Sequence, residues 1–390
     1  MPSPPAFSSL DVEDAVRARY GSAARTREEA LCCPVEYDPR HLDVIPREVL
    51  ERDYGCGDPS RYLAEGDVVL DLGSGGGKIC FIASQVVGPK GHVIGIDMNE
   101  AMLTLARKSA PEVGERIGYA NVVFHRARIQ DLGVDLDRLD ARLKEKPVSS
   151  ARELADFEHY AEQLRTSAPL IPDSSVDVVV SNCVLNLVRD ADKTKLLREI
   201  FRVLKPGGRI ALSDIVSDEV VPDRMKADPE LWSGCISGAF QESELLRGLE
   251  DAGFYGVALD NWSDAPFRVV DGIEFRAVTV TGRKGKEGPC FEGNHAMIYR
   301  GPWRKVEDDD GHVLRRGERT AVCVKTFRIY SQPPYAGDFV AVPPRVEIPE
   351  DAQKPFDCNR RAPRHPRETK GEGYDETTEA AGACCPSEAD

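Results

Sequence analysis

Five cysteines of this chain stand beside Gly, Pro, Asn or Ser residues, where turns rather than buried strands or helices are expected. They are the neighbours Cys32 and Cys33 and the single residues Cys56, Cys183 and Cys235. A structural thiol usually lies inside an apolar run, whereas residues of turns are the ones that commonly contact ligands. Thiolate sulfur binds soft ions. This placement therefore predicts that several thiols face one soft target.

A glycine-rich segment, Asp71–Gly77, follows an apolar run and precedes an expected helix. Glycines let the backbone pass close to a ligand, and the start of a helix offers unpaired N–H groups. Dinucleotide folds use a similar loop, and a turn without any ligand is a further alternative. Two acids favour S-adenosylmethionine instead. Asp71 is placed to meet an ammonium group and would repel a pyrophosphate, and Asp97, at the end of the next strand, is placed to accept hydrogen bonds from ribose hydroxyls.

Strand-like and helix-like segments alternate around this loop, which predicts an α/β fold with a parallel, Rossmann-like sheet. We expect strands at residues 68–72, 92–97, 122–125, 176–180 and 209–213. We expect helices at residues 79–87, 101–108 and 195–204, the last of which should end at the turn Lys205–Gly208. Asn182 then lies at the carboxyl end of the fourth strand, where open α/β sheets bind ligands.

The composition restricts the partners of the chain. With 390 residues and 41% hydrophobic content, the chain can form one large core and a second, smaller one. The formal net charge of -15 disfavours nucleic acids and anionic membranes, because both require a basic face. No stretch approaches the roughly 20 apolar residues of a membrane span, so we expect a soluble, cytoplasmic monomer. Eleven cysteines are too few for a disulfide scaffold in a chain of this length, and a reducing cytosol would keep most of them as thiols.

Four motifs together resemble those of the arsenite methyltransferases, a branch of the class I S-adenosylmethionine-dependent methyltransferases. They are Asp71–Gly77, Gly95–Met98, Ser181–Leu187 and Arg202–Gly208. The glycine loop is common to the whole class, so the cysteine motifs Tyr54–Gly57 and Leu231–Ala239 narrow the resemblance to this branch. The resemblance covers Tyr20 to Phe254 and implies methylation of trivalent arsenic, which is a detoxification reaction.

The resemblance also implies a role for each turn cysteine. Cys183 and Cys235 are the principal arsenic ligands, Cys56 is the third, and Cys32 or Cys33 exchanges with Cys56 when the methylated product is reduced. Three sulfurs leave the lone pair of arsenic as the nucleophile, so the transfer requires alignment rather than a general base. Methyl transfer oxidises arsenic. A dithiol can return it to the trivalent state by forming a disulfide, which an external thiol reductant, glutathione or thioredoxin, reopens.

The resemblance to the arsenite methyltransferases also implies which residues bind the methyl donor. Tyr54 is expected to close over the donor, Asp71 to meet its methionine end, and Asp97 its ribose. The full predicted set is Tyr54, Asp71, Gly73, Ser74, Gly75, Asp97, Met98, Ile129, Gln130 and Asn182.

The assignments have alternatives. Cys183 and Cys235 could serve only packing, and Cys80 is expected in the core, because unpaired cysteine is among the most buried residue types. Zinc is disfavoured because no CxxC pair or His-x-His spacing occurs. The adjacent Cys384 and Cys385 resemble the paired cysteines that end some family members. They could collect or deliver arsenic, but we expect them to do nothing essential. The whole protein could be an arsenic-binding or sequestering module without turnover, or a class I methyltransferase for another small molecule, but an intact donor site favours the enzyme.

Changes in composition predict four parts. We expect an N-terminal helical cap at residues 1–60, a methyltransferase domain at 61–256, a smaller C-terminal β-rich domain at 257–349 and a flexible tail at 350–390. Within the second part, residues 131–172 should form an inserted helical pair, because Leu residues recur there at helical spacing. Within the third part, strands are expected at residues 276–280, 296–299, 320–324 and 327–330.

Overall fold

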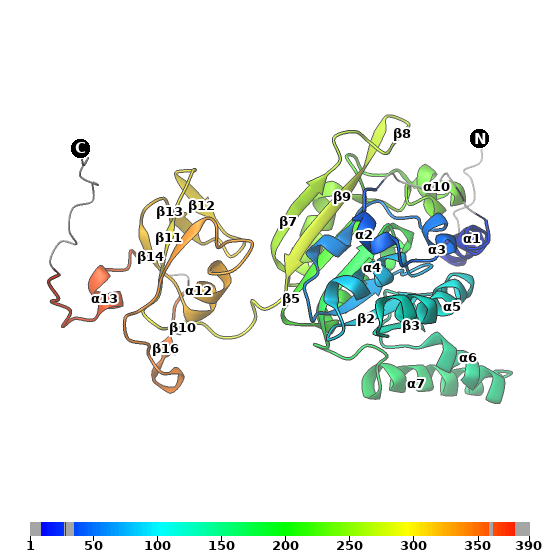
Figure 1. The fold of residues 1–390 in the computed structure, drawn as a ribbon, viewed down its shortest axis with the longest axis horizontal. Coiled ribbons are helices and arrows are strands. Elements are labelled where there is room, and N and C mark those ends of the chain that lie inside the picture. Colours follow the sequence, from blue (N-terminus) through cyan, green and yellow to red (C-terminus); the bar gives the residue numbers. More distant parts are fainter. Residues whose placement is uncertain (1–8, 27, 29–34, 359–361, 379–390) are drawn as a thin grey trace, which may run out of the picture. The chain divides into compact units, whose positions relative to one another are not determined.

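The computed structural model describes residues 9–26, 28, 35–358 and 362–378. The chain divides into two compact units, residues 1–285 and residues 286–390. Each unit has its own β-structure (Figure 1). Each also has its own hydrophobic core. Among the described residues, no helix combines the length and the apolar character needed to cross a membrane.

The first unit is built on a nine-stranded sheet with the main strand order β3-β2-β1-β4-β5-β9-β7. Its first five strands in sequence are mutually parallel: β1 (Val68–Leu72), β2 (His92–Asp97), β3 (Val122–Arg126), β4 (Val176–Asn182) and β5 (Leu204–Ser217). This arrangement confirms the predicted Rossmann-like sheet. The strand order reverses between β1 and β4, and at such a point the loops that leave the carboxyl ends diverge and leave a crevice.

Antiparallel strands complete this sheet beyond β5. β9 (Ile273–Arg283) lies between β5 and β7 (Tyr255–Trp262), and the short strands β6 (Phe240–Gln241) and β8 (Arg268–Val270) pair with β5 and β9. The expected domain boundary after residue 256 would cut β7, so it is corrected to Gly285. The reason is that alternate residues of β9 are buried in the core of the first unit.

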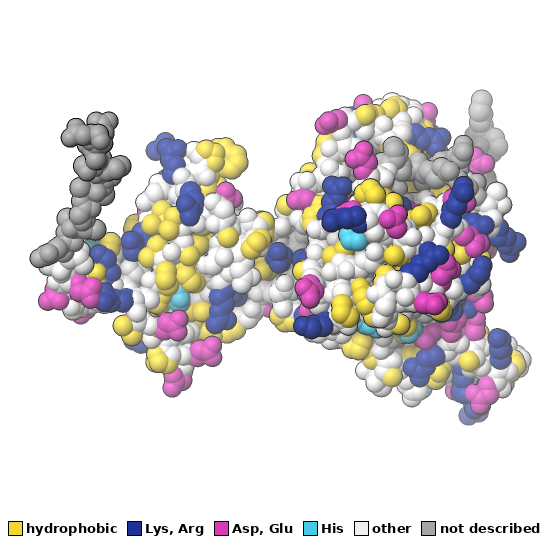
Figure 2. Space-filling model, in the orientation of Figure 1, with side chains coloured by type: hydrophobic (Ala, Val, Ile, Leu, Met, Phe, Trp, Pro, Cys, Tyr) yellow, Lys and Arg dark blue, Asp and Glu magenta, His cyan; other side chains and the backbone are white. Residues whose placement is uncertain are grey.

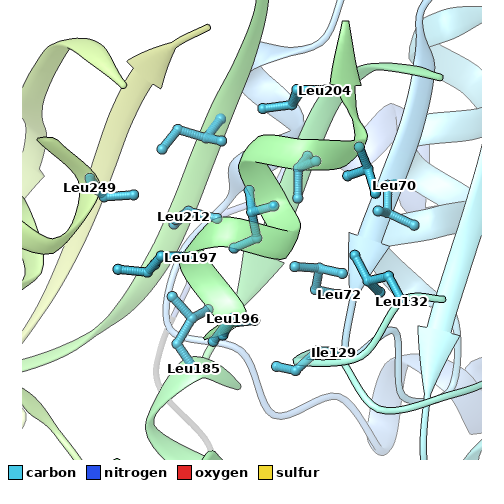
Figure 3. Close-up of a cluster of buried hydrophobic side chains, with 14 of the residues drawn as sticks. Leu70, Leu72, Ile129, Leu132, Leu185, Leu196, Leu197, Leu204, Leu212 and Leu249 are labelled. Atoms are coloured by element: carbon cyan, nitrogen blue, oxygen red, sulfur yellow. The ribbon is translucent and has the colours of Figure 1, made fainter. Parts of the chain in front are cut away.

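Helices cover both faces of the parallel strands. Val69 packs with α4 (Lys78–Val87) and α5 (Glu100–Ile117). Leu70 and Leu72 belong to the other core, with residues of α8 (Asp190–Val203) and α11 (Glu242–Asp251), as Figure 3 shows. Successive side chains of a strand point to opposite faces, so the apolar residues of β1 contribute to both cores.

The segment after β3 forms the predicted helical pair, α6 (Leu136–Glu145) and α7 (Ala151–Ser167) (Figure 1). Asp135 and Ser150 cap the first turns by accepting hydrogen bonds from backbone N–H groups. Polar contacts hold these two helices to the segment that follows β3. They include an ion pair of 2.9 Å between Arg165 of α7 and Asp131.

The N-terminal part is helical, as predicted, with α1 (Ser9–Ala23), α2 (Pro39–Leu42), α3 (Arg47–Glu51) and the 3-10 helix η2 (Pro59–Tyr62). Val12 and Val16 of α1 pack against Trp232 of α10 (Pro229–Ser233), which follows the short helix α9 (Asp223–Lys226). This contact places α1 beside the loop that carries Cys235.

The second unit is β-rich, as predicted. β11 (Ala296–Tyr299) lies between β14 (Arg319–Ala321) and β15 (Phe339–Val342), while β10 (Phe291–Glu292) pairs with β16 (Lys354–Pro355) and β12 (Lys305–Glu307) with β13 (Val313–Arg315). The remaining elements are α12 (Val324–Tyr330), η4 (Glu350–Ala352) and α13 (Pro366–Lys370). The core comprises Met297, Tyr299, Leu314, Val322, Tyr330 and Phe339.

Three local expectations are corrected. Residues 327–330 are helical rather than extended, because Cys323 caps α12 and Tyr330 turns into the core. The segment Lys205–Gly208 is part of β5 rather than a turn before it. Residues 350–378 are not a tail without structure in their described part, since Arg364 is almost completely buried and pairs with Glu292 at 2.7 Å. Residues 379–390, with Cys384 and Cys385, lie outside the described residues.

On the face shown in Figure 2, Lys and Arg side chains are scattered among Asp and Glu side chains. This face of the described chain has no continuous basic patch of the kind that binds a polyanion.

Candidate active site

A cavity opens at the carboxyl ends of β1, β2 and β4, where the strand order reverses. Its empty space is about 1090 Å³, including the part open to solvent, which suits a ligand the size of a nucleoside derivative. All ten predicted donor-binding residues line it: Tyr54, Asp71, Gly73, Ser74, Gly75, Asp97, Met98, Ile129, Gln130 and Asn182. Helix α1 adds Glu13, Val16, Arg17 and Tyr20, which sequence reasoning missed because only tertiary packing brings α1 to this place.

The glycine loop requires glycine for both conformation and space. Gly73, Gly75 and Gly77 all have positive φ, at 74°, 51° and 92°. A side chain at Gly73 would overlap Val184, which also lines the cavity. The Gly75 N–H donates to Asp97 Oδ2 at 2.9 Å, so the acid at the end of β2 holds the loop as well as facing the cavity. Burial raises the pKa of Asp97, against the lowering effect of hydrogen bonds from the Asn99 and Gly75 N–H groups.

Asp71 is a buried carboxyl group, only 1% exposed, at the end of β1. Burial raises its pKa to about 7, although Cys80 Sγ donates to Asp71 Oδ2 at 3.2 Å. In the part of the chain that the structure describes, no Lys or Arg forms an ion pair with Asp71. The nearby Lys78 instead pairs with Asp53 at 2.9 Å and lies 3.6 Å from the centre of the Tyr37 ring.

The cavity fits S-adenosylmethionine in charge and in shape. This donor carries a positive ammonium and a positive sulfonium, and the buried carboxyl group of Asp71 lacks a cationic protein partner among the described residues. Asp97 lies at the end of β2, where ribose hydroxyls are bound in such sheets. Met98, Ile129 and Val184 supply apolar surface for a flat base.

The cysteine motif at Cys56 is bound directly to the end of β4. Asn182 Oδ1 accepts hydrogen bonds from the N–H groups of Cys56 and Gly57, at 2.8 and 3.1 Å, and Asn182 Nδ2 donates to the Gly57 carbonyl at 2.8 Å. Gly55 allows this close approach, because any side chain there would overlap Asn182. Cys56 and Cys183 form a disulfide with their Cα atoms 5.8 Å apart.

Cys235 joins the same buried group from the loop after α10. Its Sγ donates to the Cys183 carbonyl at 3.2 Å and lies 3.7 Å from the Tyr20 hydroxyl. Cys56, Cys183 and Cys235 belong to one buried cluster. Cys183 and Cys235 both have left-handed backbone conformations, with φ of 59° and 60°. The structure thus gathers three of the five predicted cysteines, whereas Cys32 and Cys33 lie outside the described residues.

Asp214 of β5 is a site residue that sequence reasoning missed. It is 2% exposed, and a carboxylate oxygen lies within 4.8 Å of the sulfurs of both Cys56 and Cys183. Oδ2 accepts from the Leu185 N–H at 2.8 Å, and burial raises the pKa of Asp214 to about 6. The available signal was an acid that directly follows the predicted fifth strand, residues 209–213.

Cys80 has the role that the sequence predicted. It is completely buried in the core beneath the glycine loop, with Phe81 and Ile82. Its thiol donates a hydrogen bond to Asp71, so Cys80 supports a residue that lines the cavity. It does not belong to the buried cluster of Cys56, Cys183 and Cys235.

The fold and this cavity define a Rossmann-like methyltransferase. The family described as "Methyltransferase domain" matches residues 63–153 and 144–253, and a family described as "Domain of unknown function (DUF8838)" matches residues 286–374. The arsenite methyltransferase of Aquipseudomonas alcaligenes is 30% identical over 349 residues, covering 84% of this chain and 90% of that protein. The human arsenite methyltransferase is 30% identical over 365 residues, covering 88% and 87%.

Similarity to a solved structure extends over both units. The crystal structure of CrArsM, an arsenic(III) S-adenosylmethionine methyltransferase from Chlamydomonas reinhardtii, is 26% identical with a TM-score of 0.54. It covers 83% of this chain and is itself covered completely. This chain belongs to the arsenite methyltransferase family.

Proposed function

We propose that this protein transfers the methyl group of S-adenosylmethionine to trivalent arsenic held by the thiolates of Cys56, Cys183 and Cys235. One observation carries the proposal. Cys183 lines the cavity that contains all ten predicted donor-binding residues, and it belongs to the buried cluster with the other two cysteines. A substrate held by these sulfurs would therefore meet a donor bound in the cavity.

The substrate enters by exchange of its oxygens for sulfur. Each As–O bond of arsenite is replaced by an As–S bond, and each thiol proton leaves with the displaced hydroxide as water. The lone pair of the resulting three-coordinate arsenic is the nucleophile. S-Adenosylmethionine supplies an electrophilic methyl group. The As–C bond forms as the S–CH₃ bond breaks, and the bonding pair stays on the donor sulfur.

The protein contributes alignment and exclusion of water rather than acid–base chemistry. Asp71 faces the positive end of the donor. The glycine loop, which Asp97 holds in place, positions the methionine part of the donor. Asn182 attaches the Cys56 loop to β4 beside Cys183. Fixing the two reactants in this way is worth several orders of magnitude in rate.

The disulfide supports a specific route for the reduction step. Transfer leaves arsenic pentavalent, and two of its sulfur ligands can form an S–S bond, which gives two electrons to arsenic and returns it to the trivalent state. Cys56 and Cys183 are bonded in the structure, so we assign this role to them. Water then supplies a hydroxide to the methylated arsenic, which Cys235 still holds. An external thiol reductant, glutathione or thioredoxin, provides two electrons to reopen the disulfide.

Cys32 or Cys33 has a place in this route as the internal thiol. A thiolate from this pair could attack the disulfide at Cys56 and release Cys183, before the external reductant completes the exchange. The proposal therefore keeps the predicted exchange with Cys56 and adds Cys183 as its other partner.

A steady-state assay with product identification tests the proposal. Purified protein is incubated with the donor, arsenite and glutathione, and methylated arsenicals and S-adenosylhomocysteine are measured together. We expect one S-adenosylhomocysteine for each methyl group found on arsenic, and neither product when arsenite is omitted. Binding of donor and arsenite without product would instead identify a sequestering module, and S-adenosylhomocysteine formed only with an organic acceptor would identify a different methyltransferase.

A further inference from the structure

A second group of thiols lies in the second unit and includes none of the cysteines of the proposed reaction. The sulfurs of Cys290, Cys323 and Cys358 all lie within 4.8 Å of one another. None of the three belongs to a disulfide. They come from three separate segments of the chain, and the proposed methyl transfer leaves them without a role.

The short β10–β16 pair brings two of these cysteines together. Cys290 directly precedes β10, and the Phe356 N–H donates to the Cys290 carbonyl at 2.9 Å. Cys358 follows two residues later. Arg364 secures this region, because it is almost completely buried and binds both carboxylate oxygens of Glu292 in β10, at 2.7 and 2.8 Å.

The third cysteine is held by its own hydrogen bonds. Cys323 is 1% exposed at the start of α12, where its Sγ accepts a hydrogen bond from the Thr326 N–H at 3.3 Å and lies 3.2 Å from Thr326 Oγ1. These contacts fix the position of the Cys323 sulfur. Cys290 and Cys358 are only partly buried, and Cys323 and Cys358 line a small cavity of about 270 Å³, including the part open to solvent.

Coordination number distinguishes the candidate ions. A structural zinc site has four protein ligands, whereas trivalent arsenic is satisfied by three sulfurs and keeps its lone pair. Among the described residues of this unit, no His, Asp, Glu or fourth Cys joins the three-sulfur group. Within the described part of the chain, the ligand set is therefore complete for arsenic and incomplete for zinc.

We infer that Cys290, Cys323 and Cys358 form a second binding site for trivalent arsenic, separate from the transfer site. Binding is an exchange without oxidation: three As–O bonds become As–S bonds, and three waters leave. Inorganic arsenite, with three exchangeable positions, should bind more tightly than a monomethyl arsenical, which has two. The inference concerns binding alone and does not depend on the proposed methyl transfer.

Arsenic stoichiometry of the full-length chain tests the inference. The background variant Cys56→Ser/Cys183→Ser/Cys235→Ser removes the transfer site. After reduction with a phosphine and removal of unbound arsenite, we expect it to retain one tightly bound arsenic per chain with three sulfur neighbours in X-ray absorption. Adding Cys290→Ser, Cys323→Ser and Cys358→Ser should remove that arsenic. Donor binding, measured in both variants, checks that the first unit remains folded.

Further variants distinguish the loss of an arsenic ligand from misfolding of the second unit. The single change Cys358→Ser, at a partly exposed position, should leave arsenic with fewer sulfur neighbours. The changes Cys32→Ser/Cys33→Ser and Cys384→Ser/Cys385→Ser, introduced separately into the background, should leave the bound arsenic unchanged.

Three results would overturn the inference. They are arsenic retained after all three second-unit changes, zinc that co-purifies with the three cysteines and resists replacement by arsenite, and a background variant that binds no arsenic. Failure of methyl transfer with this site intact would count against the proposed function alone.

Discussion

Replacing Asp71 with Asn should make the donor-free protein more stable while weakening its donor binding. Burial raises the pKa of Asp71 from its ordinary value of 3.8 to about 7. Each pKa unit corresponds to about 1.4 kcal/mol, so ionised Asp71 costs about 4 kcal/mol of folding free energy above pH 7. The folded state holds this proton more tightly than the unfolded state, so the free energy of unfolding falls as pH rises from about 4 to 7. Asn removes this cost.

Donor binding should change in the opposite direction. A charge-assisted hydrogen bond from the donor ammonium to Asp71 is worth about 1.5–3 kcal/mol, so Asp71→Asn should raise the Kd about 10- to 150-fold. A bound cation stabilises the ionised carboxylate. Wild-type affinity should therefore decrease as pH falls below about 7, with protons released on binding in that range, and the variant should lack this dependence.

Denaturant unfolding at pH 5 and pH 8 and calorimetric titration with S-adenosylmethionine measure both effects. Asp177→Asn is a matched control, because Asp177 lies near the start of β4, away from the cavity, and binds Lys205. This control should leave the donor Kd unchanged. An Asp71→Asn variant with wild-type affinity, or one less stable than wild type at pH 8, would refute the reasoning.

Three other changes test separate parts of the site. Asp97→Ala should weaken donor binding about tenfold or more, since it removes charge-assisted hydrogen bonds to ribose and the contact that holds Gly75; an unchanged calorimetric Kd would exclude this role. Cys183→Ser or Cys235→Ser should bind the donor normally yet fail to methylate arsenite, because a hydroxyl is a poor ligand for a soft ion; full turnover would assign that cysteine to packing. Cys32→Ser/Cys33→Ser should still bind trivalent arsenic but lose multiple-turnover rate to a similar extent with arsenite and with a monomethyl arsenical, because the pair reopens the disulfide formed after each transfer; no loss on either substrate would contradict this.

Local sequence signals predicted the parts of the fold that depend on local chemistry. The strands β1 and β2 carry the expected acids, Asp71 and Asp97, at or near their carboxyl ends. The helices α6 and α7 lie in the predicted insertion. Conversely, α12 contradicted a strand prediction because apolar residues alone do not distinguish a short helix from a strand. In α12, the helix is favoured by its N-terminal cap, which Cys323 provides.

The parts that sequence did not predict depend on distant contacts. β9 joins the first unit because it inserts between β5 and β7, which no local pattern reveals. Asp214 and Tyr20 reach the cysteines only through the packing of β5 and α1. Likewise, Cys290, Cys323 and Cys358 lack the paired spacing of common metal motifs and meet only in three dimensions.

A single turnover without external reductant tests the central claim most directly. Reduced protein loaded with arsenite is mixed with donor carrying a deuterated methyl group, then quenched with a thiol-blocking reagent for analysis of arsenic and cysteines by mass spectrometry. The account predicts one deuterated methylarsenical per chain and, at the same rate, loss of two thiols to a disulfide that contains Cys56, paired with Cys183 or, after internal exchange, with Cys32 or Cys33. A methylarsenical formed while Cys56 remains reduced, or no methylarsenical from protein that binds both ligands, would contradict it.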